Sequence, residues 1–307
     1  MANTHNSLKA GSLFPAEIVK DIFNKVKGHS TLAKLSGQEP IPFSGTEQFI
    51  FNLEGNAQIV GEGEDKKPGE AKLTSKVIKP LKFVYQARIT DEFKYSSREQ
   101  QLNYLNAFSN GFSVKIAQAF DIAAMHGLEP QSMTEASFKA TNSFDGLVTD
   151  NVIEYNAENI EDDIDTAVQT VVNNDGDVNG LALSNQAASA LGKVKVNGVV
   201  QYPEFRFGGR PEDFHGMSTD VNKTLTTVAE GAEKDHVIVG DFANSFKWGY
   251  ALNIPMEIIE YGDPDNTGRD LKNRNEILLR AEAFIGWGIL LPENFSRIVE
   301  TDSGVEG

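Results

Sequence analysis

Residues 250–300 read YALNIPMEIIEYGDPDNTGRDLKNRNEILLRAEAFIGWGILLPENFSRIVE. Within this stretch, every odd position from Ile277 to Trp287 is apolar, whereas the even positions include the charged Glu276, Arg280 and Glu282. An alternation with a period of two is typical of a strand that buries one face. The letters ILLRAEAF also have good helix propensity, so the pattern alone leaves both structures open.

Composition excludes several classes of protein. The chain has 307 residues, no cysteine and a net charge of −16. Without cysteine, neither a disulfide nor thiolate chemistry is possible. Proteins that bind duplex phosphates use a basic face, so direct nucleic-acid recognition is not expected from this acidic chain. No apolar run reaches eighteen residues and no secretory signal pattern occurs, so we expect no membrane span.

Two runs with alternating apolar residues follow the first forty residues. They are TEQFIFNLE at 46–54 and VIKPLKFVYQARIT at 77–90. Between them lies IVGEGEDKKPGEAK, whose glycines and proline favour turns. We expect the two runs to pair as a long loop. Because an isolated two-stranded hairpin is marginally stable in water, we also expect another subunit to cover it.

A long helix is predicted next. Ser96 and Glu99 have the spacing of a capping box, apolar residues recur every three or four positions from Leu102 to Ala123, and Gly127 ends the run. A helix over about 97–126 would span roughly 45 Å.

The rest of the chain mixes helices and strands. IEDDIDTAVQTVV predicts a helix capped by Asn159, SNQAASAL one capped by Ser184, HVIVGD a buried strand, and FANSFKWGY an exposed turn. The order is that of an α+β protein, because it lacks the regular alternation of a doubly wound sheet.

Catalytic and metal motifs are weak. DGDVNG at 175–180 fits the opening of a calcium loop, but position twelve is Gln186 where a glutamate is needed, so we predict a turn. We assign Glu161, Asp162, Asp163 and Asp165 to the dipole of a first helical turn. The histidines lack metal-ligand spacing. We therefore expect no catalytic, cofactor or metal site, and an acidic metal-dependent enzyme is the alternative of a different class.

A resemblance to a known family extends the prediction of the fold. The acidic turn, DLKN, RAEAFIGWGI and PENFSRI, in this order, resemble the closing segment of tailed-phage major capsid proteins of the Hong Kong 97 fold. Upstream segments resemble the same family in the same order over nearly the whole chain. The resemblance implies an N-terminal arm at 1–37, an extended loop at 38–90, a peripheral domain with a long spine helix at 91–158, an axial domain at 159–250, and a return to the peripheral domain at 251–307.

The same resemblance implies a structural function without enzymatic activity. Copies would form the pentamers and hexamers of an icosahedral shell around double-stranded DNA, in a virion assembled in the host cytoplasm. The implied partners are a portal and separate scaffolding or decoration proteins. An encapsulin-like compartment of the same fold, and less so a tail or decoration protein, are the alternatives.

Residues of the arm and the loop are candidates for contacts between subunits. PAEIVKDIFNKV predicts a short amphipathic helix from Pro15 with no local core, and the loop tip mixes both signs of charge. The candidates are Phe14, Ile18, Ile22, Glu62, Glu64, Asp65, Lys66, Lys67, Glu70 and Lys72.

Overall fold

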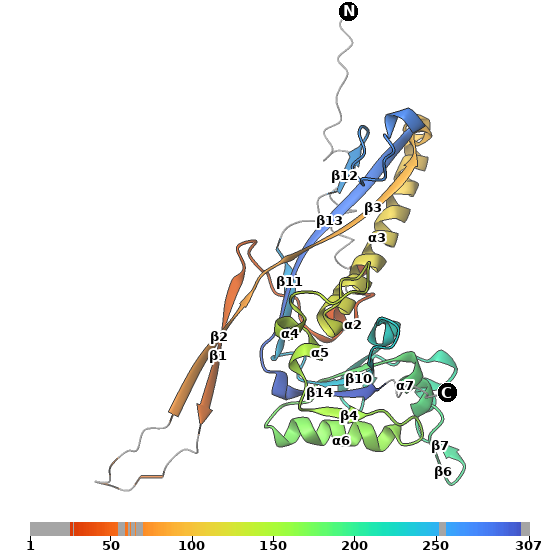
Figure 1. Ribbon diagram of the computed structural model, residues 1–307. Coiled ribbons are helices and arrows are strands. Elements are labelled where there is room, and N and C mark those ends of the chain that lie inside the picture. Colours follow the sequence, from red (N-terminus) through yellow and green to blue (C-terminus); the bar gives the residue numbers. More distant parts are fainter. Residues whose placement is uncertain are drawn as a thin grey trace, which may run out of the picture.

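The computed structural model describes residues 25–26, 28–54, 59–60, 62, 65, 70–251 and 256–301. Figure 1 shows two packed bodies and a hairpin that leads away from both. The helices of four or more residues are α2 (Thr31–Leu35), α3 (Arg98–His126), α4 (Lys139–Asn142), α5 (Phe144–Leu147), α6 (Ile160–Asn173) and α7 (Asn185–Leu191). The strands are β1 (Thr46–Glu54), β2 (Glu70–Ile78), β3 (Leu81–Thr90), β4 (Val152–Glu154), β5 (Gly180–Leu183), β6 (Lys195–Val196), β7 (Val199–Val200), β8 (Asp213–Phe214), β9 (Met217–Val221), β10 (Lys234–Gly240), β11 (Phe246–Tyr250), β12 (Met256–Ile259), β13 (Glu276–Ile289) and β14 (Phe295–Glu300). Short 3-10 turns lie between them, such as η3 (Pro203–Gly208), η4 (Lys223–Thr226) and η6 (Pro292–Asn294).

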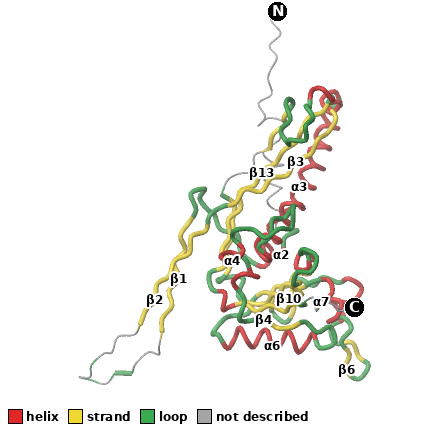
Figure 2. Tube along the Cα trace, in the orientation of Figure 1, coloured by secondary structure: helices red, strands yellow, loops and turns green. Residues whose placement is uncertain are grey.

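The long body is built on β13, which confirms the strand predicted from the alternation. β13 pairs antiparallel with β3 along one edge and with β11 and β12 along the other. Burial alternates between Leu279 and Phe284, but residues 285–289 are buried on both faces. The alternation is lost there because Ile41 and Ile78 pack close to Gly286 and Gly288 on that part of the strand. Figure 2 shows β3 and β13 lying beside α3.

Helix α3 confirms the predicted spine, with its cap one residue later than expected. The capping box joins Ser97 and Gln100, in place of Ser96 and Glu99. The Ser97 hydroxyl accepts from the Gln100 amide, and the Gln100 side chain accepts from the Ser97 amide. The helix ends at Gly127, whose φ of 62° is left-handed. Its 29 residues span roughly 44 Å.

The projecting hairpin differs from the predicted pairing. β1 pairs with β2 in an unbroken register from Thr46↔Ile78 to Glu54↔Glu70, whereas β3 pairs with β13. The two-stranded part therefore ends at Ile78, twelve residues before the predicted boundary at Thr90. β2 has a weak apolar pattern because it belongs to a separate two-stranded sheet, and neither face of that sheet is fully buried. β3 has the stronger pattern because it lies in the sheet that α3 covers.

The smaller body is a six-stranded sheet in the order β4-β14-β10-β5-β9-β8, with α6 and α7 packed against it. β4 and β14 belong to this sheet, although the predicted boundaries place them with the peripheral domain. β11 joins the long sheet, although the boundaries place it with the axial domain. The chain passes back and forth between the two bodies. Pairing between strands that are far apart in the sequence leaves no local pattern from which it could be predicted.

Several local predictions can be compared directly. α6 and α7 are confirmed, and the Ser184 hydroxyl accepts from the Ala187 amide as a cap should. Asn159 occupies the cap position of α6 but makes no side-chain capping bond. Residues 175–180 form the predicted turn into β5. The exposed turn predicted for 242–250 is wrong, because β11 is a mostly buried strand.

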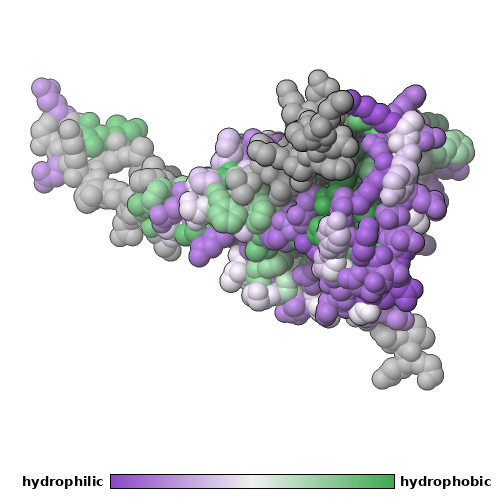
Figure 3. Space-filling model, turned by 90° about the horizontal axis from the view of Figure 1, so that it is seen from above, coloured by the Kyte–Doolittle hydropathy of each residue, from purple (hydrophilic) through white to green (hydrophobic). Residues whose placement is uncertain are grey.

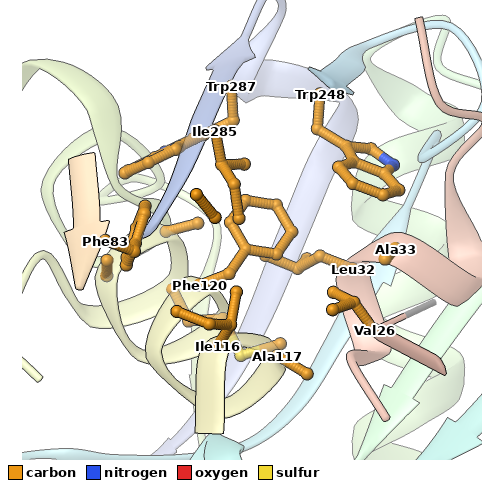
Figure 4. Packing of buried hydrophobic residues seen from close by; sticks show 14 of the residues in the cluster. Val26, Leu32, Ala33, Phe83, Ile116, Ala117, Phe120, Trp248, Ile285 and Trp287 are labelled. Carbon is orange, nitrogen blue, oxygen red and sulfur yellow. The ribbon is translucent and has the colours of Figure 1, made fainter. Parts of the chain in front are cut away.

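The main core joins the N-terminal segment to the long body. In Figure 4, Val26 and Leu32 point toward Phe120 of α3, with Trp248 and Trp287 above them. All five side chains are fully buried. Val26 and most of residues 30–36 are therefore buried in their own chain, so the arm predicted to extend to Gly37 is shorter at this end. The sequence does not reveal this packing, because the few apolar residues of the segment show no sustained period.

A substitution at Gly249 tests how this segment packs. The Glu39 amide donates to the Trp248 carbonyl over 2.9 Å, and a Cβ at Gly249 would lie 1.7 Å from the Glu39 carbonyl oxygen. We expect Gly249→Ala to lower the free energy of unfolding by about 1–3 kcal/mol, the usual cost of overpacking. Denaturant unfolding checks this. Gly37→Ala is the control, because its Cβ would meet nothing within 4 Å, and an equal loss in both variants would contradict the packing.

Candidate assembly surfaces

The hairpin carries an apolar face that no described residue of its own chain covers. In an antiparallel pair, Phe49, Leu73 and Val77 lie on one face by register and are 61%, 54% and 55% exposed. The opposite face packs at its base, where Ile78 is buried and the Lys76 ammonium donates to the Ile289 carbonyl over 2.7 Å. Figure 3 shows apolar side chains along this projecting part of the molecule. The hairpin is thus anchored on one face and open on the other.

A hollow of about 1020 Å³ lies on the long body. Its walls come from β3, from the C-terminal half of α3 and from the loop at 129–138. Lys82, Lys115, Glu129 and Glu135 give the rim both signs of charge.

The predicted contact residues fall mostly outside what the structure describes. Glu62 and Asp65 are described and exposed. Glu70 and Lys72 lie in β2, and their side chains are not among the described ones. Phe14, Ile18, Ile22, Glu64, Lys66 and Lys67 lie outside the described residues, as does most of the helix predicted from Pro15.

A buried carboxylate joins three parts of the chain. Asp121 of α3 accepts from the Ser30 hydroxyl at 2.5 Å, from the Thr31 amide at 2.9 Å and from the Thr224 hydroxyl at 3.2 Å. Thr31 also donates to Asp220, at the end of β9. The spine helix, the N-terminal segment and the smaller body meet at this side chain. Burial raises the pKa of Asp121 to about 7, although the hydrogen bonds from Ser30 and Thr31 act in the opposite direction.

Asp121 should make stability depend on pH. A carboxyl group whose pKa rises from 3.8 to about 7 on folding takes up a proton between these values, so its contribution to stability falls as the pH rises through that window. We expect the difference in unfolding free energy between wild type and Asp121→Asn to shrink or change sign from pH 4.5 to pH 7.5. Denaturant unfolding at several pH values checks this, with the exposed Asp150→Asn as control. A difference that stays constant with pH would contradict the assignment.

A second buried charge network lies where α3 ends. Arg297 of β14 contacts Asp235 at 2.8 Å and Asp145 at 2.7 Å. The His126 Nδ1 lies 3.2 Å from Asp145 and 3.8 Å from Asp235, and its Nε2 lies 3.0 Å from the Thr224 carbonyl. The Thr224 carbonyl can only accept a hydrogen bond, so Nε2 carries a proton. Nδ1 faces two carboxylates, which also accept, so the ring is best satisfied when both of its nitrogens are protonated. Burial alone would lower the pKa of His126. The hydrogen bond to Asp145 and the negative charges of Asp145 and Asp235 outweigh burial, so the pKa of His126 is raised.

The same cluster suits a salt-bridge network better than a metal ion. His126, Asp145 and Asp235 bring ligand atoms within 4.8 Å of one another. Two carboxylates, one guanidinium and one imidazolium already sum to zero charge, so a divalent ion would leave the buried cluster positive. The donor set therefore fits a neutral network that joins α3, α5, β10 and β14.

In the described part of the chain, no helix is long and apolar enough to cross a membrane.

Comparison with known proteins agrees with this architecture. No family model matches the chain. Over 131 residues it is 31% identical to "Probable major capsid protein gp17" of Mycobacterium phage D29, a match that covers 42% of the chain and 39% of that relative. The chain therefore aligns with about two fifths of the length of this curated relative.

Solved phage capsid structures extend the comparison to most of the chain. One from Mycobacterium phage Ogopogo is 30% identical, with a TM-score of 0.74, over 89% of this chain and 92% of that one. One from Gordonia phage Cozz is 20% identical, with a TM-score of 0.68, over 88% and 86%. At that lower identity the second likeness shows the fold alone. Taken with the α+β architecture and the long helix beside β13, these matches show that the chain belongs to the tailed-phage major capsid proteins of the Hong Kong 97 fold.

Proposed function

We propose that copies of this chain assemble as pentamers and hexamers into an icosahedral shell that encloses double-stranded DNA. The observation that supports this most is the β1–β2 hairpin, which projects from the body and leaves one apolar face open. A two-stranded hairpin of this kind is marginal in water by itself. A neighbouring subunit that covers Phe49, Leu73 and Val77 would supply the missing burial, at roughly 25 cal/mol per Å² of apolar surface.

The role is structural, and we propose no catalytic activity. The portal, scaffolding and decoration proteins belong to the proposal as partners in a virion assembled in the host cytoplasm. The acidic balance of −16 suits a wall that encloses DNA without binding it tightly. The curated relative is named a probable major capsid protein of a phage, which favours the phage shell over an encapsulin-like compartment.

The hairpin face gives a direct test. Phe49→Asp with Leu73→Asp adds two charges where the neighbour should pack, at positions that are exposed within the chain. We expect the variant to fold normally and to lose assembly, as seen by sedimentation velocity and electron microscopy. Gln48→Asp with Thr74→Asp is the matched control, because it adds the same charge to the other face of the hairpin. Equal assembly by both variants would refute the role of this face.

Deleting the N-terminal arm gives a second test, and the packing of the core determines where the deletion must end. A deletion should stop at residue 24, because Val26 and Leu32 are fully buried in the core. Removing residues 1–24 should leave a folded chain that does not close shells. The candidate anchors Phe14, Ile18 and Ile22 are removed by this deletion, and normal shells would count against their proposed role.

A further inference from the structure

The connection between β12 and β13 surrounds a guanidinium with oxygen atoms. It reads GDPDNTGRD at 262–270, and Figure 1 shows it at the end of the long body that lies farther from the smaller body. The guanidinium belongs to Arg88 of β3, the strand that pairs with β13. Four oxygens lie within hydrogen-bonding distance of its Nη2, from the side chains of Asp263, Asp265 and Thr267 and from the carbonyl of Arg269.

The order of these oxygens along the chain is that of a calcium loop. Such loops take ligands from the side chains at positions 1, 3 and 5 and from the backbone carbonyl at position 7, with glycine at position 6. Counted from Asp263, the four oxygens occupy positions 1, 3, 5 and 7, and Gly268 at position 6 has a left-handed φ of 75°. The Asp263 carboxylate also accepts from the Thr267 and Gly268 amides, at 3.0 Å and 2.7 Å, which closes the loop.

The oxygens exceed what an arginine nitrogen can use. Nη2 carries two hydrogen atoms, so it can make two good hydrogen bonds, whereas four oxygens lie within 2.9 Å of it. A metal ion has no such limit, and Ca²⁺ takes six to eight oxygen ligands. The charges agree, because the single charge of Arg88 meets the carboxylates of Asp263, Asp265 and Glu276. Both the number of oxygens and the excess negative charge suit a divalent cation.

A second run with the same spacing shows that the motif alone does not build such a cage. DGDVNG at 175–180 also has oxygen-bearing side chains at positions 1, 3 and 5 and glycine at position 6. There the Asn179 side chain donates to Asp241 over 2.5 Å, and no described lysine or arginine pairs with Asp175 or Asp177. The cage at 263–269 therefore rests on the arrangement of its oxygens around Arg88.

We infer that residues 263–269 form a calcium-type loop in which the guanidinium of Arg88 takes the place of the metal ion, and that the loop binds Ca²⁺ once this guanidinium is removed. Because Arg88 is part of β3, the cation is tethered beside the loop at a high effective concentration. Its side chain is only 10% exposed. The wild-type connection is thus held to β3 without a diffusible ion, and neither calcium nor a chelator should change its stability.

Removing the guanidinium should uncover the calcium site. Arg88→Ala empties the position of Nη2, and Arg88→Gln does so while keeping more of the side-chain stem, which favours folding. We expect both variants to bind Ca²⁺ with a Kd of roughly 0.1–1 mM, the range of weak natural loops, because position 12 is Arg274 where such loops have glutamate. Wild type should bind at least tenfold more weakly. Calorimetric titration with calcium chloride measures the affinity, and calcium should raise the thermal midpoint of the two variants alone.

Two further variants separate this loop from general binding to an acidic chain. Lys82→Ala is the matched control, because Lys82 lies on the same face of β3 and contacts Glu282 of β13 at 2.6 Å, away from the loop. It should gain no calcium binding. Asp263→Asn added to Arg88→Ala removes the charge at position 1 and should weaken calcium binding at least tenfold.

Three results would overturn the inference. In the first, neither Arg88 variant, folded or refolded in calcium, binds the ion more tightly than wild type. In the second, wild type binds calcium as tightly as the variants, so that Arg88 is not the resident cation. In the third, Lys82→Ala gains the same affinity, so that calcium binds the acidic surface in general. These measurements use the unassembled chain, so their outcome is independent of the proposed shell.

Discussion

Replacing Arg297 by methionine is expected to lower the free energy of unfolding by about 3–5 kcal/mol. The guanidinium is buried and contacts Asp235 at 2.8 Å and Asp145 at 2.7 Å. It also lies 3.3 Å from the Val148 carbonyl. Methionine has a similar length but no charge, so two buried carboxylates would face only the imidazolium of His126.

Lys234→Met is the matched control for that loss. Lys234 pairs with Glu300 at 3.9 Å, and both side chains are more than 40% exposed. An exposed pair contributes less than about 1 kcal/mol. Denaturant unfolding of the unassembled chain measures both variants. If Arg297→Met unfolds at the same denaturant concentration as the control, the network does not hold the two bodies together as described.

The second large effect is expected at Trp287. The side chain is fully buried and its ring centroid lies 5.7 Å from Phe120 and 5.5 Å from Phe138. Its Nε1 donates to the Asn142 carbonyl over 2.9 Å. Trp287→Ala should cost about 3–5 kcal/mol, because it removes packing and leaves a cavity where α3, α4 and β13 meet.

Trp248 provides the probe for this measurement, because the chain has two tryptophans. Fluorescence of the remaining Trp248 follows unfolding of the same core. Tyr95→Ala, at a side chain that is 84% exposed, is the control and should change stability by no more than about 0.5 kcal/mol. Equal stability of the two variants would mean that the aromatic cluster is not the centre of the core.

Elements whose pattern is local were predicted well. The spine helix follows from apolar spacing and Gly127, and β13 from its alternation, because these signals depend on neighbours within one element. The shift of the cap from Ser96 to Ser97 shows the usual error of such signals, since two adjacent serines offer the same chemistry.

Features set by distant contacts could not be predicted in the same way. β1 pairs with β2, and β14 with β10, through registers that no local pattern encodes. The buried networks leave only a faint signal in the sequence. Asp121 interrupts the apolar run IAQAFDIAAM, and Arg297 interrupts FSRIV. A lone charge in an apolar run indicates a buried partner, but the identity of that partner depends on the fold.

Surface contacts were the hardest feature to predict. Most of the arm and loop-tip candidates lie outside the described residues. The open hairpin face, which the structure does reveal, involves apolar residues such as Phe49 and Leu73. Their exposure could not be seen in the sequence, because an apolar residue in a strand or turn is more often buried.

Electron microscopy of the purified full-length chain, alone and coexpressed with its neighbouring genes, shows whether copies of this chain build a shell. We predict closed shells or rings of five and six subunits in at least one of the two preparations. A folded, uniform monomer in both preparations would contradict the proposed assembly.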